Sequence, residues 1–117
     1  MTKNDLLPSK SKAFAVRIIR CYIFLQNEKK EFVLSKQLLR SGTSIGANIR
    51  EAIRGQSKAD FYAKLYISLK EAEETEYWLE LLNETDFLSD VNFKSLYNDC
   101  EELLRLLMST MKSKYEL

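Results

Sequence analysis

One heptad-spaced seam in the middle of the chain constrains the fold more than any other feature. Apolar or small side chains recur there at intervals of four and three residues. The seam consists of Phe61, Leu65, Ser68, Ala72, Thr75, Leu79 and Leu82. This spacing puts all of them on one face of an α-helix and does not match the alternation of a half-buried strand. The sequence therefore predicts a long helix over residues 57–83, with Ser57 as its N-terminal cap.

Similar periodicity on both sides of this seam predicts three more helices. Residues 9–28 carry a stripe formed by Phe14, Ile18, Cys21 and Leu25, and residues 35–54 carry one from Leu38 to Ala52. Residues 90–115 carry a stripe formed by Tyr97, Cys100, Leu104, Leu107 and Met111, flanked by Leu96 and Leu103. Residues 1–8 are expected to form a flexible tail that ends at Pro8, with Ser9 as the cap of the first helix.

The architecture follows from the chain length and from the short connections. A chain of 117 residues supports one core, so residues 1–117 should form a single domain. Short connections make sequential helices antiparallel neighbours. The sequence therefore predicts an all-α protein with an antiparallel up-down-up-down four-helix bundle.

The composition excludes most enzyme classes. The chain has no histidine, which removes nucleophile–histidine catalysis and the usual di-iron site of helical bundles. We therefore predict no enzymatic activity, no cofactor, no metal and no small-molecule substrate. No apolar run approaches a membrane span and the N-terminus does not resemble a signal peptide, so a cytoplasmic protein is expected. Cys21 and Cys100 are expected to be buried free thiols, with a single disulfide as the alternative.

Two of the three glycines, Gly42 and Gly46, lie in the stretch SGTSIGAN, residues 41–48. A phosphate-binding loop would need a preceding strand and a Gly-Lys-Ser/Thr ending, and both are missing. Each mid-helix glycine costs roughly 1 kcal/mol relative to alanine, so a compensating contact is expected. We interpret Gly42, Ser44, Gly46 and Ala47 as a surface that lets another helix approach closely; a ligand site and a local kink of the helix are the alternatives. Trp78 is expected at the core or at an interface.

Polar residues after the glycines are candidates for specific contacts. Asn48 is a poor residue for a helix interior, so its side chain should bond a specific partner. Asn48, Arg50, Glu51 and Glu73 are predicted to make internal or inter-subunit polar contacts, including an ion pair between Arg50 and Glu73. Ligand or nucleic-acid contact is the alternative for Asn48. The carboxylate row of the third helix is expected to be solvated or ion-paired, with Mg²⁺ or Ca²⁺ binding as a minor alternative.

The charge is divided between the two halves of the chain. Residues 1–64 hold 13 basic and 5 acidic side chains, whereas residues 65–117 hold 5 basic and 12 acidic ones. The basic band of the first two predicted helices and their connection consists of Lys10, Lys12, Arg17, Arg20, Lys29, Lys30, Lys36 and Arg40. Two hypotheses follow. In the first, the opposite charges of the two halves attract each other, either within one bundle or between subunits of an assembly. In the second, the basic band binds nucleic acid.

The motifs QLLRSGTSIGANIREA, QSKADFYAKL and LKEAEETEYWLELL, within residues 35–82, carry a family resemblance. The sequence resembles the four-helix-bundle family named for reading frames within 23S rRNA intervening sequences, related to the accessory proteins of diversity-generating retroelements. The resemblance implies an antiparallel four-helix bundle that assembles into a homopentamer, without an established enzymatic activity. The retroelement branch implies nucleic-acid binding as the alternative function.

Overall fold

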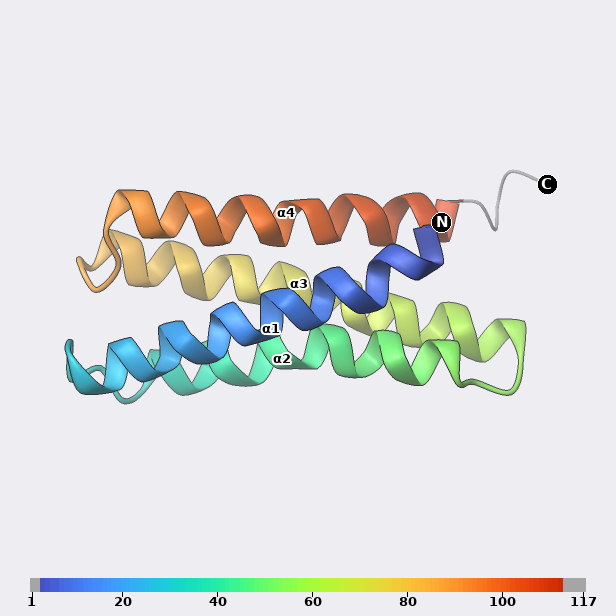
Figure 1. Cartoon of the computed structure of the whole chain (residues 1–117), viewed down its shortest axis with the longest axis horizontal. Coiled ribbons are helices and arrows are strands. Elements are labelled where there is room, and N and C mark those ends of the chain that lie inside the picture. The colour runs from blue at the N-terminus through green and yellow to red at the C-terminus, as the bar shows by residue number, and fades with distance from the viewer. Residues whose placement is uncertain (1–2, 113–117) are drawn as a thin grey trace.

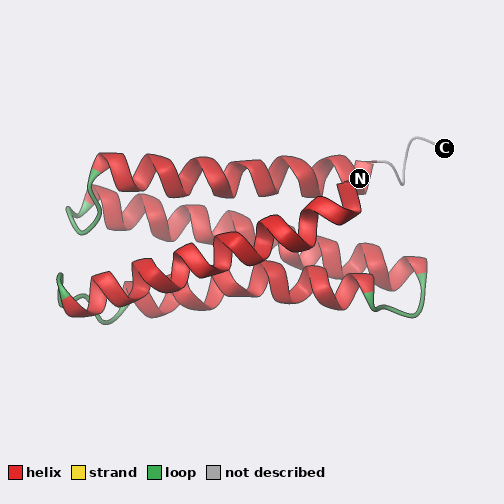
Figure 2. Ribbon diagram, in the orientation of Figure 1, coloured by secondary structure: helices red, strands yellow, loops and turns green. Residues whose placement is uncertain are grey.

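Four helices make up most of residues 3–112, the part of the chain that the computed structural model describes (Figures 1 and 2). They are α1 (Lys3–Asn27), α2 (Leu34–Ile53), α3 (Lys58–Glu84) and α4 (Asp90–Lys112). No strand occurs in residues 3–112. The predicted all-α fold is confirmed.

The four helices lie side by side in a bundle with extents of 48 × 22 × 22 Å. Figure 1 shows that the chain reverses direction at each connection, so that successive helices are antiparallel. Both α1 and α3 pack against α2 and α4. Consequently α1 and α3 run in the same direction and occupy diagonal corners of the bundle. This diagonal placement matters for the surfaces described below.

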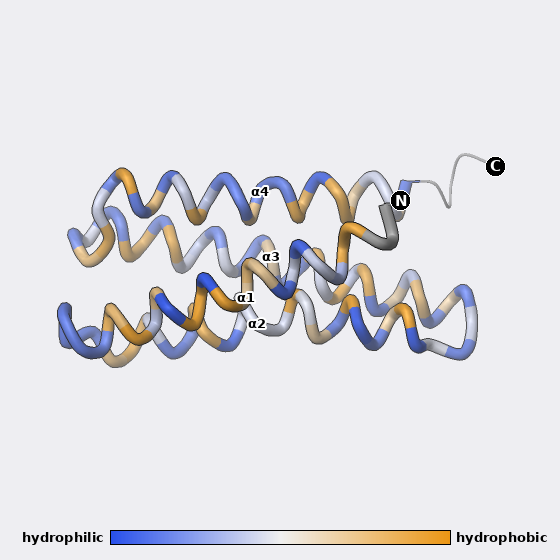
Figure 3. The backbone as a smooth tube through the Cα atoms, in the orientation of Figure 1, coloured by the Kyte–Doolittle hydropathy of each residue, from blue (hydrophilic) through white to orange (hydrophobic). Residues whose placement is uncertain are grey.

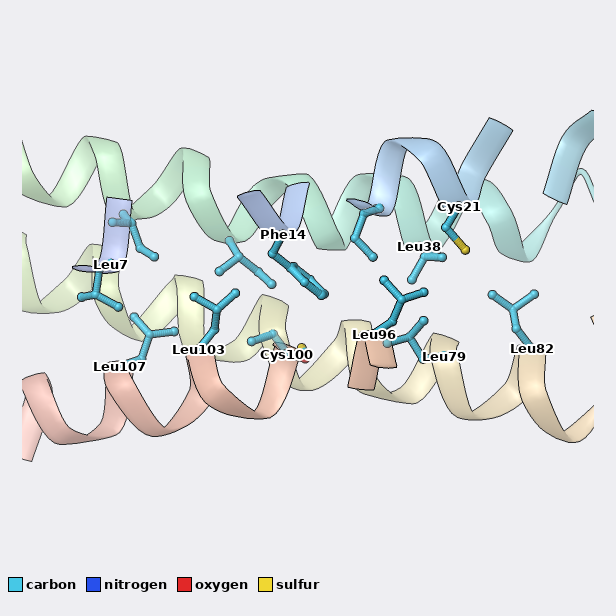
Figure 4. Packing of buried hydrophobic residues seen from close by; sticks show 14 of the residues in the cluster. Leu7, Phe14, Cys21, Leu38, Leu79, Leu82, Leu96, Cys100, Leu103 and Leu107 are labelled. Atoms are coloured by element: carbon cyan, nitrogen blue, oxygen red, sulfur yellow. The ribbon is translucent and has the colours of Figure 1, made fainter. Parts of the chain in front are cut away.

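The core lies along the axis, where apolar side chains from all four helices meet. Figure 3 shows that apolar residues recur along every helix, and Figure 4 shows side chains such as Phe14, Leu38, Leu79 and Leu103 pointing toward one another. The predicted stripes of α1 and α3 are confirmed. The structure buries the four stripe residues of α1, which are Phe14, Ile18, Cys21 and Leu25. It also buries every seam residue of α3 except Phe61, which is half-buried. In α4 the prediction is partly wrong. Cys100, Leu107 and the flanking Leu103 are buried, whereas Tyr97, Leu104 and Met111 are only half-buried.

The prediction of a tail over residues 1–8 is wrong for residues 3–8, because α1 begins at Lys3 and includes Pro8. Pro8 lies in the second turn, where its missing N–H removes one helical hydrogen bond. Burial of Leu7, which is only 1% exposed, offsets that loss. Ser9 does not cap the helix; its hydroxyl donates to the carbonyl of Leu6 at 3.2 Å.

Capping side chains explain where α3 and α4 begin. The hydroxyl of Ser57 accepts from the backbone N–H of Asp60 at 3.0 Å, which confirms the predicted cap of α3. The hydroxyl of Ser89 accepts from the N–H of Asn92 at 3.2 Å in the same way and caps α4.

The start of α2 is stabilised by Glu31, which sequence analysis missed. Its carboxylate accepts from the N–H groups of Val33, Leu34 and Ser35 at 3.2, 3.0 and 2.6 Å. The hydroxyl of Ser35 donates back to the carbonyl of Glu31 at 2.8 Å. Burial acts to raise the pKa of Glu31, but these hydrogen bonds favour the charged form more strongly, so the pKa is lowered.

Candidate assembly surfaces and polar sites

The glycines of α2 lie against α1. A Cβ atom added at Gly42 would come within 2.8 Å of both Cγ1 and Cγ2 of Ile18. A Cβ at Gly46 would lie 3.2 Å from Oγ and 3.5 Å from the backbone carbonyl carbon of Ser11. Two helices separated by so little space need small residues at the contact. The absent side chains at these two positions therefore set how closely α1 approaches α2.

Small polar residues join α2 to α3 in the core. The hydroxyl of Thr75 donates to the hydroxyl of Ser41 at 2.9 Å, and that of Ser68 donates to the carbonyl of Ile45 at 2.8 Å. All three hydroxyl-bearing residues are fully buried. The heptad pattern predicted the positions of Ser68 and Thr75 but not their partners. These two bonds fix the register of α3 against α2.

The other residues of the glycine stretch make mostly local contacts. The hydroxyl of Ser44 donates to the carbonyl of Arg40 at 2.6 Å, and Nδ2 of Asn48 donates to the carbonyl of Ser44 at 2.9 Å. Ala47 is exposed.

Trp78 is half-buried against the core, and its Nε1 donates to Oε2 of Glu74 at 3.0 Å.

The predicted ion pair between Arg50 and Glu73 is wrong, because the register separates the two residues. Thr75 lies opposite Ser41 and the two helices are antiparallel, so Glu73 lies level with residue 43 of α2, about 10 Å along the axis from Arg50. Glu51 instead pairs with Nζ of Lys64 at 3.3 Å. Both Arg50 and Glu73 are exposed.

Ion pairs within the bundle neutralise part of the predicted basic band. Lys10 pairs with Glu102 at 3.3 Å and Arg17 with Asp99 at 2.6 Å, both across the α1–α4 contact. Arg40 pairs with Glu71 at 3.3 Å and also with Glu74, across the α2–α3 contact. The rest of the band is exposed and comprises Lys12, Arg20, Lys29, Lys30 and Lys36. The opposite charges of the two halves of the chain thus meet inside one bundle.

An open groove of about 990 Å³ lies between the first half of α1, the second half of α2 and the start of α3. Its charged lining consists of Lys12, Arg50, Arg54, Lys64, Glu51 and Asp60. Since Lys64 pairs with Glu51, the groove keeps three exposed basic side chains against one carboxylate, that of Asp60. This local excess of positive charge favours an anionic ligand.

Two apolar stripes lie on the outside of the bundle. On α1, Val16, Ile19 and Ile23 are 43%, 42% and 50% exposed. On α3, Tyr66 and Tyr77 are 52% and 54% exposed. We call these the α1 stripe and the α3 stripe. Because α1 and α3 occupy diagonal corners, the stripes lie on opposite sides of the molecule, and water covers apolar area on both.

A cluster of carboxylates lies where α3 meets α4. Oε2 of Glu76 is buried and has no hydrogen-bond partner among residues 3–112. Burial, followed by the charges of Glu101, Glu80 and Glu73, raises the pKa of Glu76 to about 7. The hydroxyl of Tyr97 donates to Oε2 of Glu80 at 3.1 Å. In residues 3–112 no group of three or more potential ligand side chains is arranged to hold a metal ion.

Replacing Glu76 with glutamine should stabilise the protein at pH 8 but not at pH 4. The unfolded state loses the Glu76 proton near pH 4.5 and the folded state near pH 7, so ionisation costs stability as the pH rises through that window. After allowance for solvent screening, we expect a gain of about 1 kcal/mol at pH 8. Chemical denaturation at both pH values measures it. Glu84→Gln, at the exposed last residue of α3, is the control and should gain clearly less, because only the weak effect of the helix end is removed. A gain from Glu76→Gln that is equal at both pH values would contradict the ionisation mechanism.

Both cysteines are free and buried, at different places in the core. Burial raises the pKa of Cys21 to about 11 and also raises the pKa of Cys100. Thiolate is the reactive form of cysteine, so these raised pKa values indicate inert, structural thiols.

None of the helices in residues 3–112 is long and apolar enough to cross a membrane.

Taken together, the topology and the buried seams define an antiparallel four-helix bundle with small-residue helix contacts and two exposed apolar stripes. Residues 6–109 match the family model of the 23S rRNA-intervening sequence protein. The chain belongs to this family, which confirms the resemblance found in the sequence.

A solved structure agrees with this assignment. The crystal structure of a protein with unknown function from the S23 ribosomal protein family of Bacteroides thetaiotaomicron is 58% identical in sequence, with a TM-score of 0.94. The match covers 95% of this chain and 99% of that one. A comparison with curated proteins found no match.

Proposed function

We propose that this protein is a non-enzymatic, homo-oligomeric four-helix bundle that acts as an assembly or scaffold. The observation that carries the proposal is the pair of apolar stripes on α1 and α3. Apolar area of this kind on opposite sides of a small bundle is stabilised by contact with protein. The family resemblance implies five copies. We also propose a cytoplasmic location, with which the two free thiols in the core are consistent.

Light scattering behind size exclusion, at low and high salt, tests this proposal. We expect a mass that is a multiple of 13.7 kDa, near five times that value, and that is stable to salt because the interface is apolar. Ile19→Lys should shift the mass toward one chain. Met108→Lys, at a position on α4 that is 57% exposed, is the matched control and should keep the assembly. A single-chain mass for the unmodified protein at both salts would refute the proposal.

Nucleic-acid binding is the second candidate, and the observation in its favour is the basic excess of the groove at Lys12, Arg50 and Arg54. Phosphate contacts release counterions, so affinity for a single-stranded or duplex probe should fall steeply as salt rises. Arg54→Gln should lower the salt slope by about one if Arg54 contacts a phosphate. Affinity that is unchanged by salt and by this substitution would eliminate the groove as a nucleic-acid site.

A further inference from the structure

We propose that the α1 stripe of one copy packs against the α3 stripe of the next copy in a head-to-tail contact. This inference rests on the proposed oligomeric function and adds the interface and the relative orientation of the copies. Its occupant is a second copy of this chain.

Each stripe belongs to a row of exposed residues, and the two rows have the same spacing. On α1, Lys12 precedes the stripe, and Lys12, Val16, Ile19 and Ile23 follow one another at intervals of four, three and four residues. On α3, the same intervals separate Tyr66, Lys70, Glu73 and Tyr77. All eight side chains are exposed. Each set spans about 16 Å of helix, and intervals of four and three are those at which two helices pack along a seam.

The stripes also lie at nearly the same level along the bundle axis. Ile18 lies against Gly42, and Thr75 bonds to Ser41, so Ile18 and Thr75 share one level. Ser11 lies against Gly46, and Ser68 bonds to Ile45, which places that pair about two turns away. Residue n of α1 is thus roughly level with residue n + 56 of α3. The two rows are offset by only about 3 Å, less than one helical turn.

This level arrangement leaves little rise between successive copies. A head-to-tail contact forms an open helical filament when each copy rises along the axis, and it closes only when copies are related by a rotation that divides a full turn. The helices α1 and α3 run in the same direction. When neighbouring copies are related by rotation about an axis parallel to the bundles, the α1 stripe of one copy is therefore parallel to the α3 stripe of the next. The two stripes are then within one helical turn of each other along that axis. A two-fold contact would instead pair one stripe with itself.

Charge further favours pairing of different stripes. The α1 stripe is flanked by exposed Lys12 and Arg20 and has no carboxylate of its own. Exposed Glu73 lies between the two tyrosines of the α3 stripe, whereas Nζ of Lys70 lies 5.8 Å from the ring centroid of Tyr66, over the aromatic face. Pairing the α1 stripe with itself would bring basic flanks together, and this repulsion disfavours a two-fold dimer through α1.

Thiol cross-linking tests the pairing directly. The background is Cys21→Ala with Cys100→Ala, and light scattering must first show that it keeps the mass of the unmodified protein. Ile19→Cys and Tyr77→Cys are then introduced on separate chains, which are co-expressed and treated with a short bifunctional maleimide. We expect cross-linked dimers from the mixture and none from either variant alone. With both substitutions on one chain, we expect a ladder that ends at the mass of the oligomer.

Each other outcome overturns the inference in a recognisable way. Dimers from Ile19→Cys alone or from Tyr77→Cys alone would show a two-fold contact. An oligomeric mass without cross-links in the doubly substituted chain would place the interface elsewhere and leave the proposed oligomer standing. A single-chain mass for the unmodified protein would refute the proposed function together with the inference. Met108→Cys, paired with Ile19→Cys, is the control and should give no cross-links.

Discussion

Replacing Gly42 with alanine should lower the free energy of unfolding by about 2 kcal/mol, although alanine is the better helix former. The added Cβ would lie 2.8 Å from two carbon atoms of Ile18. Ile18 is fully buried, so it has no free space into which to move. Overpacking of about 3 kcal/mol therefore exceeds the gain of about 1 kcal/mol in helix propensity. Chemical denaturation at a fixed chain concentration measures the difference.

Gly46→Ala is the matched control, because it changes the same residue type in the same helix. Its Cβ would lie 3.2 Å from the hydroxyl oxygen of Ser11, a contact that small shifts can relieve. We expect stability to change by no more than about 0.5 kcal/mol, as propensity and crowding nearly cancel. In an Ile18→Ala background the cost of Gly42→Ala should disappear. A stabilising effect of Gly42→Ala in the unmodified background would show that α1 is not packed tightly against α2.

Replacing Leu7 with alanine should destabilise the protein by about 2 to 3 kcal/mol, toward the lower end for a buried leucine because the site is near a helix end. Leu7 is 1% exposed and belongs to the core cluster, where Figure 4 shows it near Leu107 of α4. The substitution removes buried methyl groups and leaves a cavity between α1 and α4. Thermal or chemical denaturation measures the loss.

The neighbouring Leu6 is a suitable control because it is only half-buried. Leu6→Ala should cost clearly less than Leu7→Ala, since fewer contacts are lost. Equal and near-zero effects of both substitutions would mean that residues 6–8 behave as the tail expected from the sequence. Both measurements need one fixed chain concentration, because dissociation of an oligomer would contribute to unfolding.

The fold could be predicted from the sequence because the apolar periodicity is long and few residues interrupt it. The seam from Phe61 to Leu82 is one helical face, and the structure buries six of its seven members. The start of α1 could not be predicted in the same way. Pro8 is a local signal against a helix, whereas the burial of Leu7 depends on helices that are distant in sequence.

The candidate sites depend more strongly on tertiary register and were predicted less completely. Spacing alone could not show that Glu73 lies about two turns from Arg50, because the register depends on bonds of Ser68 and Thr75 to α2. Nor could it show which apolar residues of α1 face outward. Val16, Ile19 and Ile23 widen the core stripe in sequence, and only the positions of α2 and α4 show that these three are left exposed.

The cap formed by Glu31 limits how the chain length can vary. One carboxylate reaches three consecutive N–H groups only because Val33, Leu34 and Ser35 follow it at fixed separations. An insertion or deletion of a single residue between Glu31 and Ser35 would move those donors away and rotate α2 by about 100° relative to the connection. Natural length variation in this family should therefore be rare at residues 31–35, and linkers or fusion partners should not be inserted there.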